Sequence, residues 1–261
     1  METVPHNNLL DLKGKTAIVT GGGVGIGFGI VYRFAEAGAN VVVADISQAN
    51  LDEAKSKLET KGWHVAYTVA DVSKEEDVVA MCQTAVDTFG TLDILVNNAG
   101  IYPIKPVAQL STKEFDRVIA VNLRSVFMAT QAATKHMIAG GKGGKIINIT
   151  SIDALHPSMV GLAPYDSSKH GVWGFTKNVA LELAPHNIWV NAIAPGGINT
   201  PGTGSQDGKP APGMEAFMAK IPMKRFGHID EIGKAALFLA SDMSSYMTGA
   251  QVVVDGGVLL S

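Results

Sequence analysis

Tyr165 and Lys169 are the residues in this chain whose types and spacing most directly suggest chemistry. They stand four positions apart, and positions i and i+4 lie one above the other on the same face of a helix. A phenol is a weak acid with an unperturbed pKa of about 10, and an ammonium group beside it favours the phenolate. A lowered pKa would let the Tyr165 hydroxyl donate and accept a proton near neutral pH.

Ser151 stands fourteen residues before Tyr165, at the end of an apolar run that is typical of a strand. A hydroxyl at the carboxyl end of a strand lies where open α/β sheets bind their ligands. A serine hydroxyl and an acidified phenol together suit proton exchange with an alcohol or carbonyl oxygen. The alternative for Ser151 taken alone is an ordinary strand-end or turn serine.

A glycine-rich segment, 21–27, follows the first predicted strand and opens the first predicted helix. Glycines at such a point allow a tight turn and close approach of the backbone to a pyrophosphate at a helix N-terminus. The strict G-x-G-x-x-G register is not met, because position 26 is Ile; the run is G-x-x-x-G-x-G with Thr20 before it. The alternative, a glycine turn with no ligand, is weakened by the strand before it and the helix after it.

Asp45 ends the second predicted strand, twenty residues after Gly25. A carboxylate there suits a hydrogen bond to the 2′-hydroxyl of an adenosine ribose and would repel a 2′-phosphate. Its neighbours are Ala44 and Ile46, and no Arg or Lys stands beside it or in the glycine segment. The sequence therefore favours NAD over NADP, with a simple helix-capping role for Asp45 as the alternative.

Short β-branched runs alternate with longer helical patterns along the chain. We expect strands at 15–20, 40–45, 64–70, 92–97, 145–150, 188–194 and 251–254, and helices near 25–38, 48–61, 74–89, 111–139, 164–184 and 228–241. Near-continuous apolar strands are typical of a parallel sheet covered by helices on both faces. The pattern predicts an α/β fold: one doubly wound domain over 1–261 with a seven-stranded parallel sheet. The irregular, Gly- and Pro-rich segment at about 196–222 is predicted to be a mobile substrate loop.

The composition argues against several classes of protein. With 46% apolar and 17% charged residues, the chain can bury a sizeable core. A net charge of −3 without Lys/Arg runs argues against nucleic acid as a partner. No membrane span or secretory signal is visible, and the single cysteine, Cys82, suits a reducing compartment, so we expect a cytoplasmic location. The scattered histidines give no metal-binding motif.

Several motifs occur together in the order in which one enzyme family carries them. They are Thr20-Gly21-x-x-x-Gly25-x-Gly27, Asp71-Val72, the Asn-Asn-Ala-Gly run at 97–100, Asn122, Ser151, Tyr165-x-x-x-Lys169 and Pro195-Gly196. On these motifs the chain resembles the short-chain dehydrogenase/reductase family over nearly its full length. The resemblance implies a Rossmann-type fold and an oxidoreductase that uses NAD(P) to interconvert an alcohol and its ketone. It also implies a homotetramer formed through the two long helices at 111–139 and 164–184.

The resemblance further implies roles for individual residues. Ser151 would donate a hydrogen bond to the substrate oxygen, Tyr165 would exchange the proton with that oxygen, and Lys169 would lower the pKa of Tyr165 and bond the nicotinamide ribose. Asn122 would hold a water in a proton relay. The residues expected to contact the coenzyme are Gly21, Gly23, Val24, Ile26, Asp45, Ile46, Asp71, Val72, Asn98, Tyr165, Lys169, Pro195, Ile198 and Thr200. Those expected to contact the substrate are Ser151, Asp153 and Tyr165.

The sequence indicates less about the identity of the substrate than about the fold or the coenzyme. Asp153 and His156 are polar and suit a sugar, a polyol or a similar secondary alcohol, whereas Met159, Val160 and Leu162 suit a medium-sized ketone. We favour the hydroxy compound. The spacing from serine to tyrosine is one residue longer than the family most often shows, so the loop between them should reshape the pocket.

Three other functions stay open at this point. They are an NADPH-dependent carbonyl reductase, a dehydratase or epimerase with the same coenzyme, and a dinucleotide sensor without catalysis. The sensor is disfavoured because it has no need of the proton-relay set Asn122, Ser151, Tyr165 and Lys169.

Overall fold

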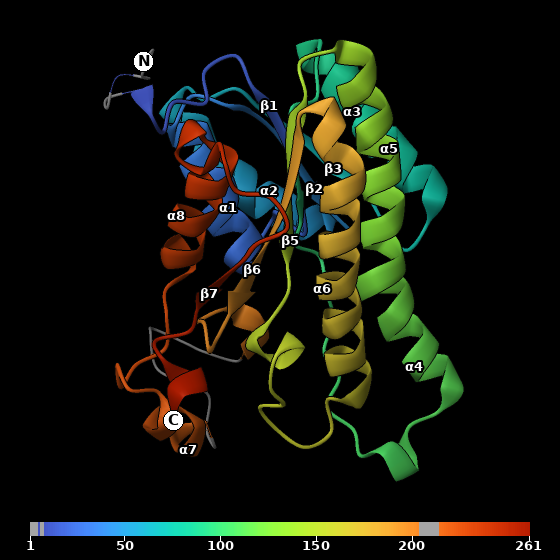
Figure 1. The fold of residues 1–261 in the computed structure, drawn as a ribbon, viewed down its shortest axis with the longest axis vertical. Coiled ribbons are helices and arrows are strands. Elements are labelled where there is room, and N and C mark those ends of the chain that lie inside the picture. Colours follow the sequence, from blue (N-terminus) through green and yellow to red (C-terminus); the bar gives the residue numbers. More distant parts are fainter. Residues whose placement is uncertain (1–4, 6–7, 204–213) are drawn as a thin grey trace.

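The computed structural model describes residues 5, 8–203 and 214–261 of the chain. In this part, seven strands form one parallel sheet in the order β3-β2-β1-β4-β5-β6-β7 (Figure 1). Their bounds are β1 Thr16–Thr20, β2 Asn40–Asp45, β3 Val65–Val69, β4 Ile94–Asn97, β5 Gly144–Ile149, β6 Ile188–Pro195 and β7 Gln251–Val254. The expected seven-stranded parallel sheet is confirmed, with strand ends shifted by one or two residues.

Helices cover both faces of the sheet (Figure 1). One layer contains α1 (Gly25–Glu36), α2 (Gln48–Leu58) and α8 (Ile229–Ala240); the other contains α3 (Glu75–Phe89), α5 (Ser125–Gly140) and α6 (Ala163–Leu183). Side chains alternate between the faces of each strand: on β1, Val19 packs into the first layer and Ile18 into the second. The strands are apolar on both sides because both sides are buried.

The residues singled out in the sequence gather at the carboxyl edge of this sheet. The glycine segment follows β1, Asp45 ends β2, Asn97 ends β4, and Ser151 comes two residues after the end of β5. The chain winds outward in opposite directions from β1 and β4, which are neighbours in the sheet. Ligands of doubly wound sheets bind at the carboxyl ends of strands where the winding reverses.

The helix predicted at 111–139 is confirmed as one unbroken helical run, but it is not α-helical throughout. It comprises α4 (Thr112–Ile119), a π-helical segment (Ala120–Arg124) and then α5. Asn122, which is 1% exposed, lies in the π segment, and its side chain bonds both backbone groups of Ile101. A π segment inside a helix often marks a functional site. The apolar periodicity does not reveal the π-helical segment, because the pattern continues on both sides of Asn122.

The predicted substrate loop is described only in part. Its residues 204–213 lie outside the described residues, so the mobility predicted for them stays a prediction. On the near side, Ile198 pairs with Gly227 in a parallel bridge and 201–203 forms a short turn. On the far side lies a short helix, α7 (Glu215–Lys220).

Candidate active site

The glycine segment forms a turn whose backbone tolerates no side chain at one position. A Cβ added to Gly27 would lie 2.1 Å from the carbonyl oxygen of Gly21. Asn98 braces the same turn by donating hydrogen bonds to the carbonyl oxygens of Thr20 (2.8 Å) and Gly21 (3.1 Å). α1 starts directly after Val24 without a side-chain cap and without an acidic residue in its first turn. Its free N–H groups and positive dipole end fit the pyrophosphate of a dinucleotide.

Asp45 connects the end of β2 to the glycine turn. It is 5% exposed, and one carboxylate oxygen accepts a hydrogen bond from the backbone N–H of Gly23 at 3.1 Å. The other oxygen accepts from the N–H of Ser47 (3.0 Å) and the side chain of Asn50 (3.2 Å). The N-cap of α2 is Ser47, so the capping role considered for Asp45 is wrong. The carboxylate is held where the turn meets the groove described next.

A groove of about 720 Å³ runs along the carboxyl edge of the sheet. It brings together many of the residues predicted to contact the coenzyme: Gly21, Val24, Ile26, Asp45, Ile46, Asp71, Val72, Asn98 and Thr200. Gly23 does not line the groove but bonds Asp45 from behind the turn. Pro195 and Ile198 line the adjoining cavity instead, together with Tyr165 and Lys169. The groove and the cavity share Ile26, Asn98, Gly100, Tyr102 and Thr200.

Asn50 and Arg117 line the groove but were not predicted from the sequence as site residues. Asn50 bonds Asp45 from the first turn of α2. Arg117 lies on α4 and contributes a positive charge near Asp71, whose pKa is lowered: burial raises it, but hydrogen bonds from Ser73 and the charges of Lys74 and Arg117 outweigh burial. No motif marks either residue. α2 packs against β2 and β3, and α4 packs against α6 and the π segment, and only these contacts in the folded chain bring the two residues to the groove.

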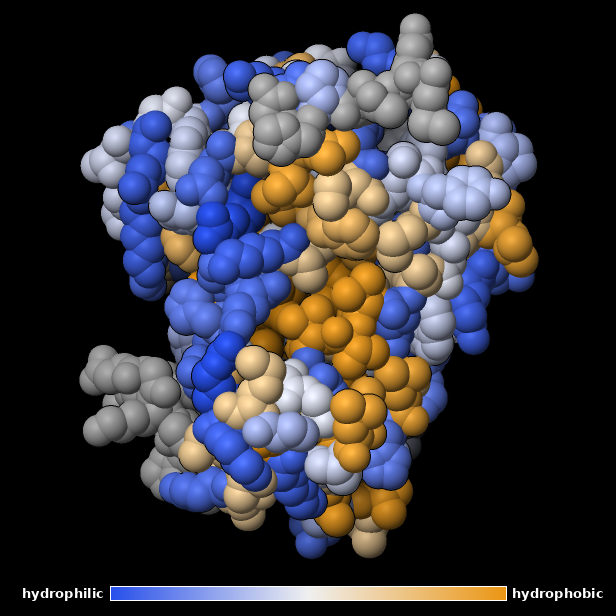
Figure 2. All heavy atoms as spheres, turned by 60° about the vertical axis from the view of Figure 1, so that its left-hand side comes forward, coloured by the Kyte–Doolittle hydropathy of each residue, from blue (hydrophilic) through white to orange (hydrophobic). Residues whose placement is uncertain are grey.

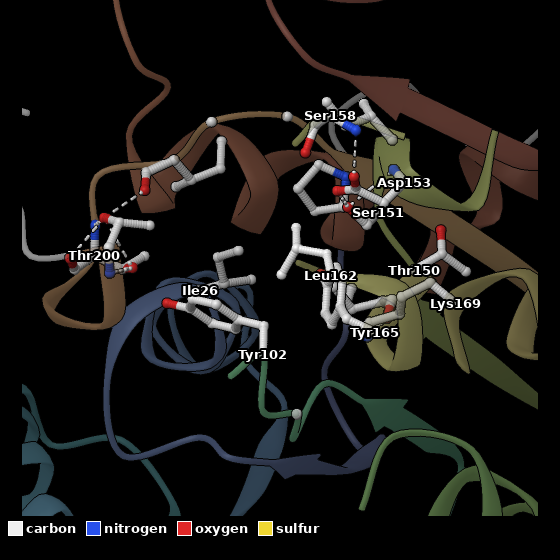
Figure 3. Close-up of a pocket in the computed structure, with 18 of the residues that line it drawn as sticks. Ile26, Tyr102, Thr150, Ser151, Asp153, Ser158, Leu162, Tyr165, Lys169 and Thr200 are labelled. Carbon is white, nitrogen blue, oxygen red and sulfur yellow. Dashed lines mark hydrogen bonds between the residues drawn. The ribbon is translucent and has the colours of Figure 1, made fainter. Parts of the chain in front are cut away.

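Beside the groove lies a cavity of about 230 Å³ that contains three of the four predicted catalytic side chains, Ser151, Tyr165 and Lys169, whereas Asn122 does not line it (Figure 3). Ser151 and Asp153 enter it from the segment after β5, and Tyr165 and Lys169 from the first turns of α6. Tyr102, from the loop after β4, lies edge-on to the Tyr165 ring with the ring centres 5.9 Å apart. Apolar side chains complete the wall: Ile26, Ile149, Ile152, Met159, Leu162, Ile198, Met214 and Phe217.

The acidified phenol expected from the sequence is not produced by the residues of this chain. Burial raises the pKa of Tyr165, a hydrogen bond with Ser151 lowers it, and the charges of Asp153 and Asp166 raise it further. The Lys169 ammonium lies 5.5 Å from the centre of the Tyr165 ring, on the same side of the helix as predicted. The correction has a physical reason, since the sequence shows the nearby charge but not the loss of water around the hydroxyl.

Lys169 is buried, with 4% of its surface exposed, and its ammonium donates a hydrogen bond to the Ile149 carbonyl oxygen at 2.7 Å. Burial lowers its pKa to about 8, against an upward effect of the Asp153 charge. It is therefore mostly protonated at neutral pH and loses its proton in mildly alkaline solution. A buried cation beside the phenol can stabilise a phenolate that forms transiently.

Replacing Lys169 by Met should change how stability depends on pH. The folded pKa of about 8 lies below the ordinary value of 10.5, so between these values the unfolded chain binds a proton that the folded chain has released. Stability from this group therefore rises with pH in that window. We expect the free energy of unfolding of the wild type to rise relative to that of Lys169→Met from about pH 8 upward, measured by urea unfolding. The exposed Lys135→Met is the control, and a constant difference for Lys169→Met would contradict the buried-ammonium assignment.

Both side-chain amide protons of Asn122 and one lone pair of its side-chain oxygen are engaged in hydrogen bonds within the protein. Its side-chain oxygen accepts from the Ile101 N–H at 2.8 Å, and its amide donates to the Ile101 carbonyl oxygen (2.8 Å) and to Ser168 (3.1 Å). These bonds anchor the loop after β4 to the π-helical segment that joins α4 and α5. Asn122 still faces Lys169 across Gly100, because a Cβ built on Gly100 would lie 3.4 Å from the Asn122 oxygen and 3.7 Å from the Lys169 ammonium. The structural use of this asparagine is thus established, and its relay role stays a prediction.

Ser151 and Asp153 are bonded to each other. The serine hydroxyl donates to an Asp153 carboxylate oxygen at 2.8 Å, and the second oxygen accepts from the backbone N–H of Ser158 at 2.8 Å. The proton that Ser151 was expected to donate to a substrate is donated to Asp153 in this structure. Asp153 does line the cavity, as predicted.

The arrangement can support proton exchange beside a dinucleotide. A hydroxyl pair, Ser151 and Tyr165, and a buried cation converge in an apolar cavity that opens onto a groove shaped for a coenzyme. Among residues 8–203 and 214–261, no cluster of three or more His, Cys, Asp or Glu side chains could hold a metal ion. Within the same part of the chain, none of the helices has the length and apolarity to cross a membrane.

The chain is similar to proteins of known class over almost all of its length. A family model described as enoyl-(acyl carrier protein) reductase matches residues 22–259. The chain is 40% identical over 252 residues to glucose 1-dehydrogenase 2 of Bacillus subtilis, covering 96% of each. It is 39% identical over 259 residues to 3beta-hydroxysteroid dehydrogenase 2 of Eggerthella lenta, covering 98% of each.

A solved structure shares the whole architecture. It is a candidate 2-deoxy-d-gluconate 3-dehydrogenase from Agrobacterium tumefaciens with bound NADP. The two chains are 37% identical and superpose with a TM-score of 0.87, covering 97% of this chain and all of the other, 100%. The relatives thus include proteins named for polar sugars and for apolar steroids.

Proposed function

The chain belongs to the short-chain dehydrogenase/reductase family, and from this premise we propose that it is a single-domain, NAD-dependent oxidoreductase for a sugar, polyol or similar secondary alcohol. Because the protein belongs to this family, it is an oxidoreductase that acts on CH–OH groups with NAD(P). The observation that carries the proposal is the convergence of Ser151, Tyr165 and Lys169 in one cavity beside the coenzyme groove.

Each polar residue of the site has its own role in the reaction. The bound coenzyme supplies the hydride acceptor or donor. Tyr165 exchanges a proton with the substrate oxygen. Burial raises the pKa of its hydroxyl and so makes it a weaker acid, an effect that a nearby positive charge opposes when the proton leaves. Lys169 stabilises the phenolate that results, and Ser151 orients the substrate oxygen by a hydrogen bond. Asn122, which faces Lys169 across Gly100, holds a water that connects Lys169 to solvent.

The coenzyme preference is supported by Asp45. Its carboxylate is fixed by three hydrogen bonds at the edge of the groove, where a negative charge suits a ribose 2′-hydroxyl and opposes a 2′-phosphate. A relative with the same fold binds NADP, so the proposed preference for NAD depends on local residues such as this one and not on the fold.

Replacing Asp45 by Ser should narrow the preference for NAD over NADP. Removing the carboxylate deletes both a hydrogen bond to the ribose and the repulsion of a phosphate, which we expect to lower the ratio of kcat/KM with NAD to that with NADP by about ten-fold or more. The affinity for NAD should also fall, because Gly23 loses its partner. Asp52→Ser, an exposed carboxylate on α2, is the matched control. If the ratio for Asp45→Ser equalled that of the control, Asp45 would not recognise the ribose.

The function itself is tested with a panel of secondary alcohols that contains sugars, polyols and alicyclic alcohols. NADH formation is followed by absorbance, and coenzyme affinity is measured separately by NADH fluorescence. Turnover of a hydroxy compound with NAD supports the proposal. Tight NADH binding without turnover of any compound, in either direction, would instead indicate a dinucleotide sensor.

An NADPH-dependent ketone reductase is the second candidate, because one feature of the cavity favours it. Much of the cavity wall is apolar, and it includes Met159, Leu162 and Phe217. A medium-sized apolar ketone would bury its surface there. Reduction of apolar ketones with NADPH, combined with no activity on sugars, would favour this candidate.

We also propose that the chain forms a homotetramer. Large apolar side chains are exposed on the outer helices, among them Phe127 on α5 and Leu181 on α6, which is 77% exposed. Figure 2 shows a further apolar band on the side of the molecule that carries α8 and β7, and β7 is an edge strand. Two separate apolar surfaces would let two-fold contacts build a dimer of dimers. Trp173 and Phe175 are half-buried, so part of each remains for such a contact.

A further inference from the structure

Asp153 is a buried carboxylate in the cavity, and the proton exchange at the substrate oxygen gives it no role. It is 5% exposed and lies in a short turn, Ile152–Ala154, directly after Ser151. Figure 3 shows its side chain together with Ser151 and Ser158 on one side of the cavity. A charge buried among apolar groups is costly unless its hydrogen bonds are made. The partners of this carboxylate therefore bear on what the cavity can bind.

The two oxygens of the Asp153 carboxylate have partners of different kinds. One oxygen accepts from the backbone N–H of Ser158 at 2.8 Å, and the other accepts from the Ser151 hydroxyl at 2.8 Å. The backbone partner stays in place when a substrate binds. The serine hydroxyl has a single proton, so Ser151 cannot donate to Asp153 and to a substrate oxygen at the same time.

The reaction takes the serine's hydrogen bond away from Asp153. Ser151 must turn its proton to the reacting oxygen of the substrate, and Tyr165 exchanges its own proton with that same oxygen. The Asp153 oxygen that Ser151 leaves is then a buried acceptor without a donor, which is unfavourable, and more so for a charged group. The substrate binds well only if it brings a donor of its own to this oxygen.

We propose that this donor is a second hydroxyl on the carbon next to the reacting carbon, so that Asp153 selects vicinal diols and the corresponding α-hydroxy ketones. The inference rests on the proposed function and names the substrate class of that site. Oxidation moves a hydride from the reacting carbon to NAD and the proton of its hydroxyl to Tyr165, which leaves an α-hydroxy ketone and NADH. The second hydroxyl takes no part in this step, so it donates to Asp153 in the alcohol and in the ketone alike.

The distance between the two side chains matches the distance within a vicinal diol. Oxygens on neighbouring carbons lie about 2.9 Å apart when the torsion between them is staggered near 60°. Ser151 Oγ and Asp153 Oδ2 are 2.8 Å apart, and both residues line the cavity. A diol can therefore place one oxygen against each side chain, so that the four oxygens form a ring at ordinary hydrogen-bond distances. Two hydroxyls on more distant carbons are too far apart to close this ring.

The surroundings of Asp153 single it out for this role. Among the described residues that line the cavity, it is the only carboxylate, and much of the remaining wall is apolar. A second carboxylate, Asp166, follows Tyr165 on α6 but does not line the cavity. Replacing Asp166 therefore removes a nearby charge without removing an acceptor from the cavity, which makes it a matched control.

The first experiment needs only the wild type. It compares cyclohexanol, the cyclohexanediol with hydroxyls on adjacent carbons, and the isomer with hydroxyls on opposite carbons, with NADH formation as the readout. We expect kcat/KM for the adjacent diol to exceed that for each of the other two by about ten-fold or more, because only this diol pairs the buried acceptor. The opposite isomer is equally polar and so tests the spacing of the hydroxyls. The best substrate of the alcohol panel is compared in the same way with its analogue that lacks the neighbouring hydroxyl.

The second experiment removes the acceptor. Asp153→Ala and Asp153→Leu have no oxygen to accept from a second hydroxyl, and the leucine fills the space of the carboxylate. In both variants we expect kcat/KM for the adjacent diol and for cyclohexanol to agree within about three-fold. Asp166→Asn should keep the ratio of the wild type. NADH fluorescence titration and thermal unfolding of each variant show that the coenzyme groove and the fold are intact.

Each outcome decides the matter. A wild-type preference for adjacent hydroxyls that is lost in the Asp153 variants and kept in Asp166→Asn supports the proposal. Equal turnover of the adjacent diol and cyclohexanol by the wild type, a preference that survives in the Asp153 variants, or an equal loss in Asp166→Asn overturns it, while the proposed function stands. A wild type that turns over no alcohol or ketone at all removes the proposed function, and the inference with it.

Discussion

Tyr165→Phe is expected to lower turnover by at least about a thousand-fold, because the variant has no hydroxyl to exchange a proton with the substrate oxygen. The ring itself, and its edge-on contact with Tyr102, should be retained. The affinity for NADH should stay within several-fold of the wild type, since the glycine turn and Asp45 are unchanged. Steady-state kinetics in both directions and NADH fluorescence titration measure the two quantities separately.

Tyr102→Phe is the control for this experiment. Its hydroxyl lies in the same cavity, where it bonds Thr200, and its ring faces Tyr165. We expect turnover of Tyr102→Phe to remain within about ten-fold, because no proton exchange is assigned to that hydroxyl. Substantial turnover by Tyr165→Phe, or an equal loss in the two variants, would exclude Tyr165 as the group that exchanges the proton.

The fold could be predicted from the sequence because its determinants are local and periodic. Runs such as the one at 41–44 are apolar at every position, which is typical of a strand buried on both faces, and β2 is such a strand. Once alternation with helices indicates a parallel sheet, the carboxyl ends of all strands meet at one edge. Asp45 and Ser151 therefore had to lie at the same edge of the sheet, although they stand far apart in the sequence.

The parts of the site that could not be predicted depend on burial and on contacts between distant segments. The raised pKa of Tyr165 follows from the absence of water around it, which a four-residue spacing does not show. The bond between Asp153 and Ser151 depends on the turn after β5, and the anchoring of Ile101 by Asn122 joins segments 21 residues apart. Periodicity and motif spacing describe neighbours along an element, and these contacts are made between elements or in irregular turns.

Gly27→Ala should weaken coenzyme binding strongly, and the same substitution at a second glycine provides the comparison. The Cβ that this substitution adds would lie 2.1 Å from the Gly21 carbonyl oxygen and 2.6 Å from the Asn98 side-chain nitrogen. Real Cβ atoms do not approach backbone so closely, so the turn must move. We expect NADH affinity to fall by at least about a hundred-fold, since the backbone N–H groups that would meet the pyrophosphate move with it. Overpacking should also lower stability, by about 1–3 kcal/mol.

Gly174→Ala makes the same chemical change where space is available. Gly174 lies on α6, and a Cβ there would meet nothing within 4 Å. Because alanine is the better helix former, by roughly 1 kcal/mol, this variant should be as stable as the wild type or more so, with unchanged NADH affinity. Fluorescence titration and thermal unfolding of the two variants give the comparison. If Gly27→Ala bound NADH within a few-fold of Gly174→Ala, the turn after β1 would not hold the coenzyme, and the placement of the hydride donor beside Tyr165 would fail with it.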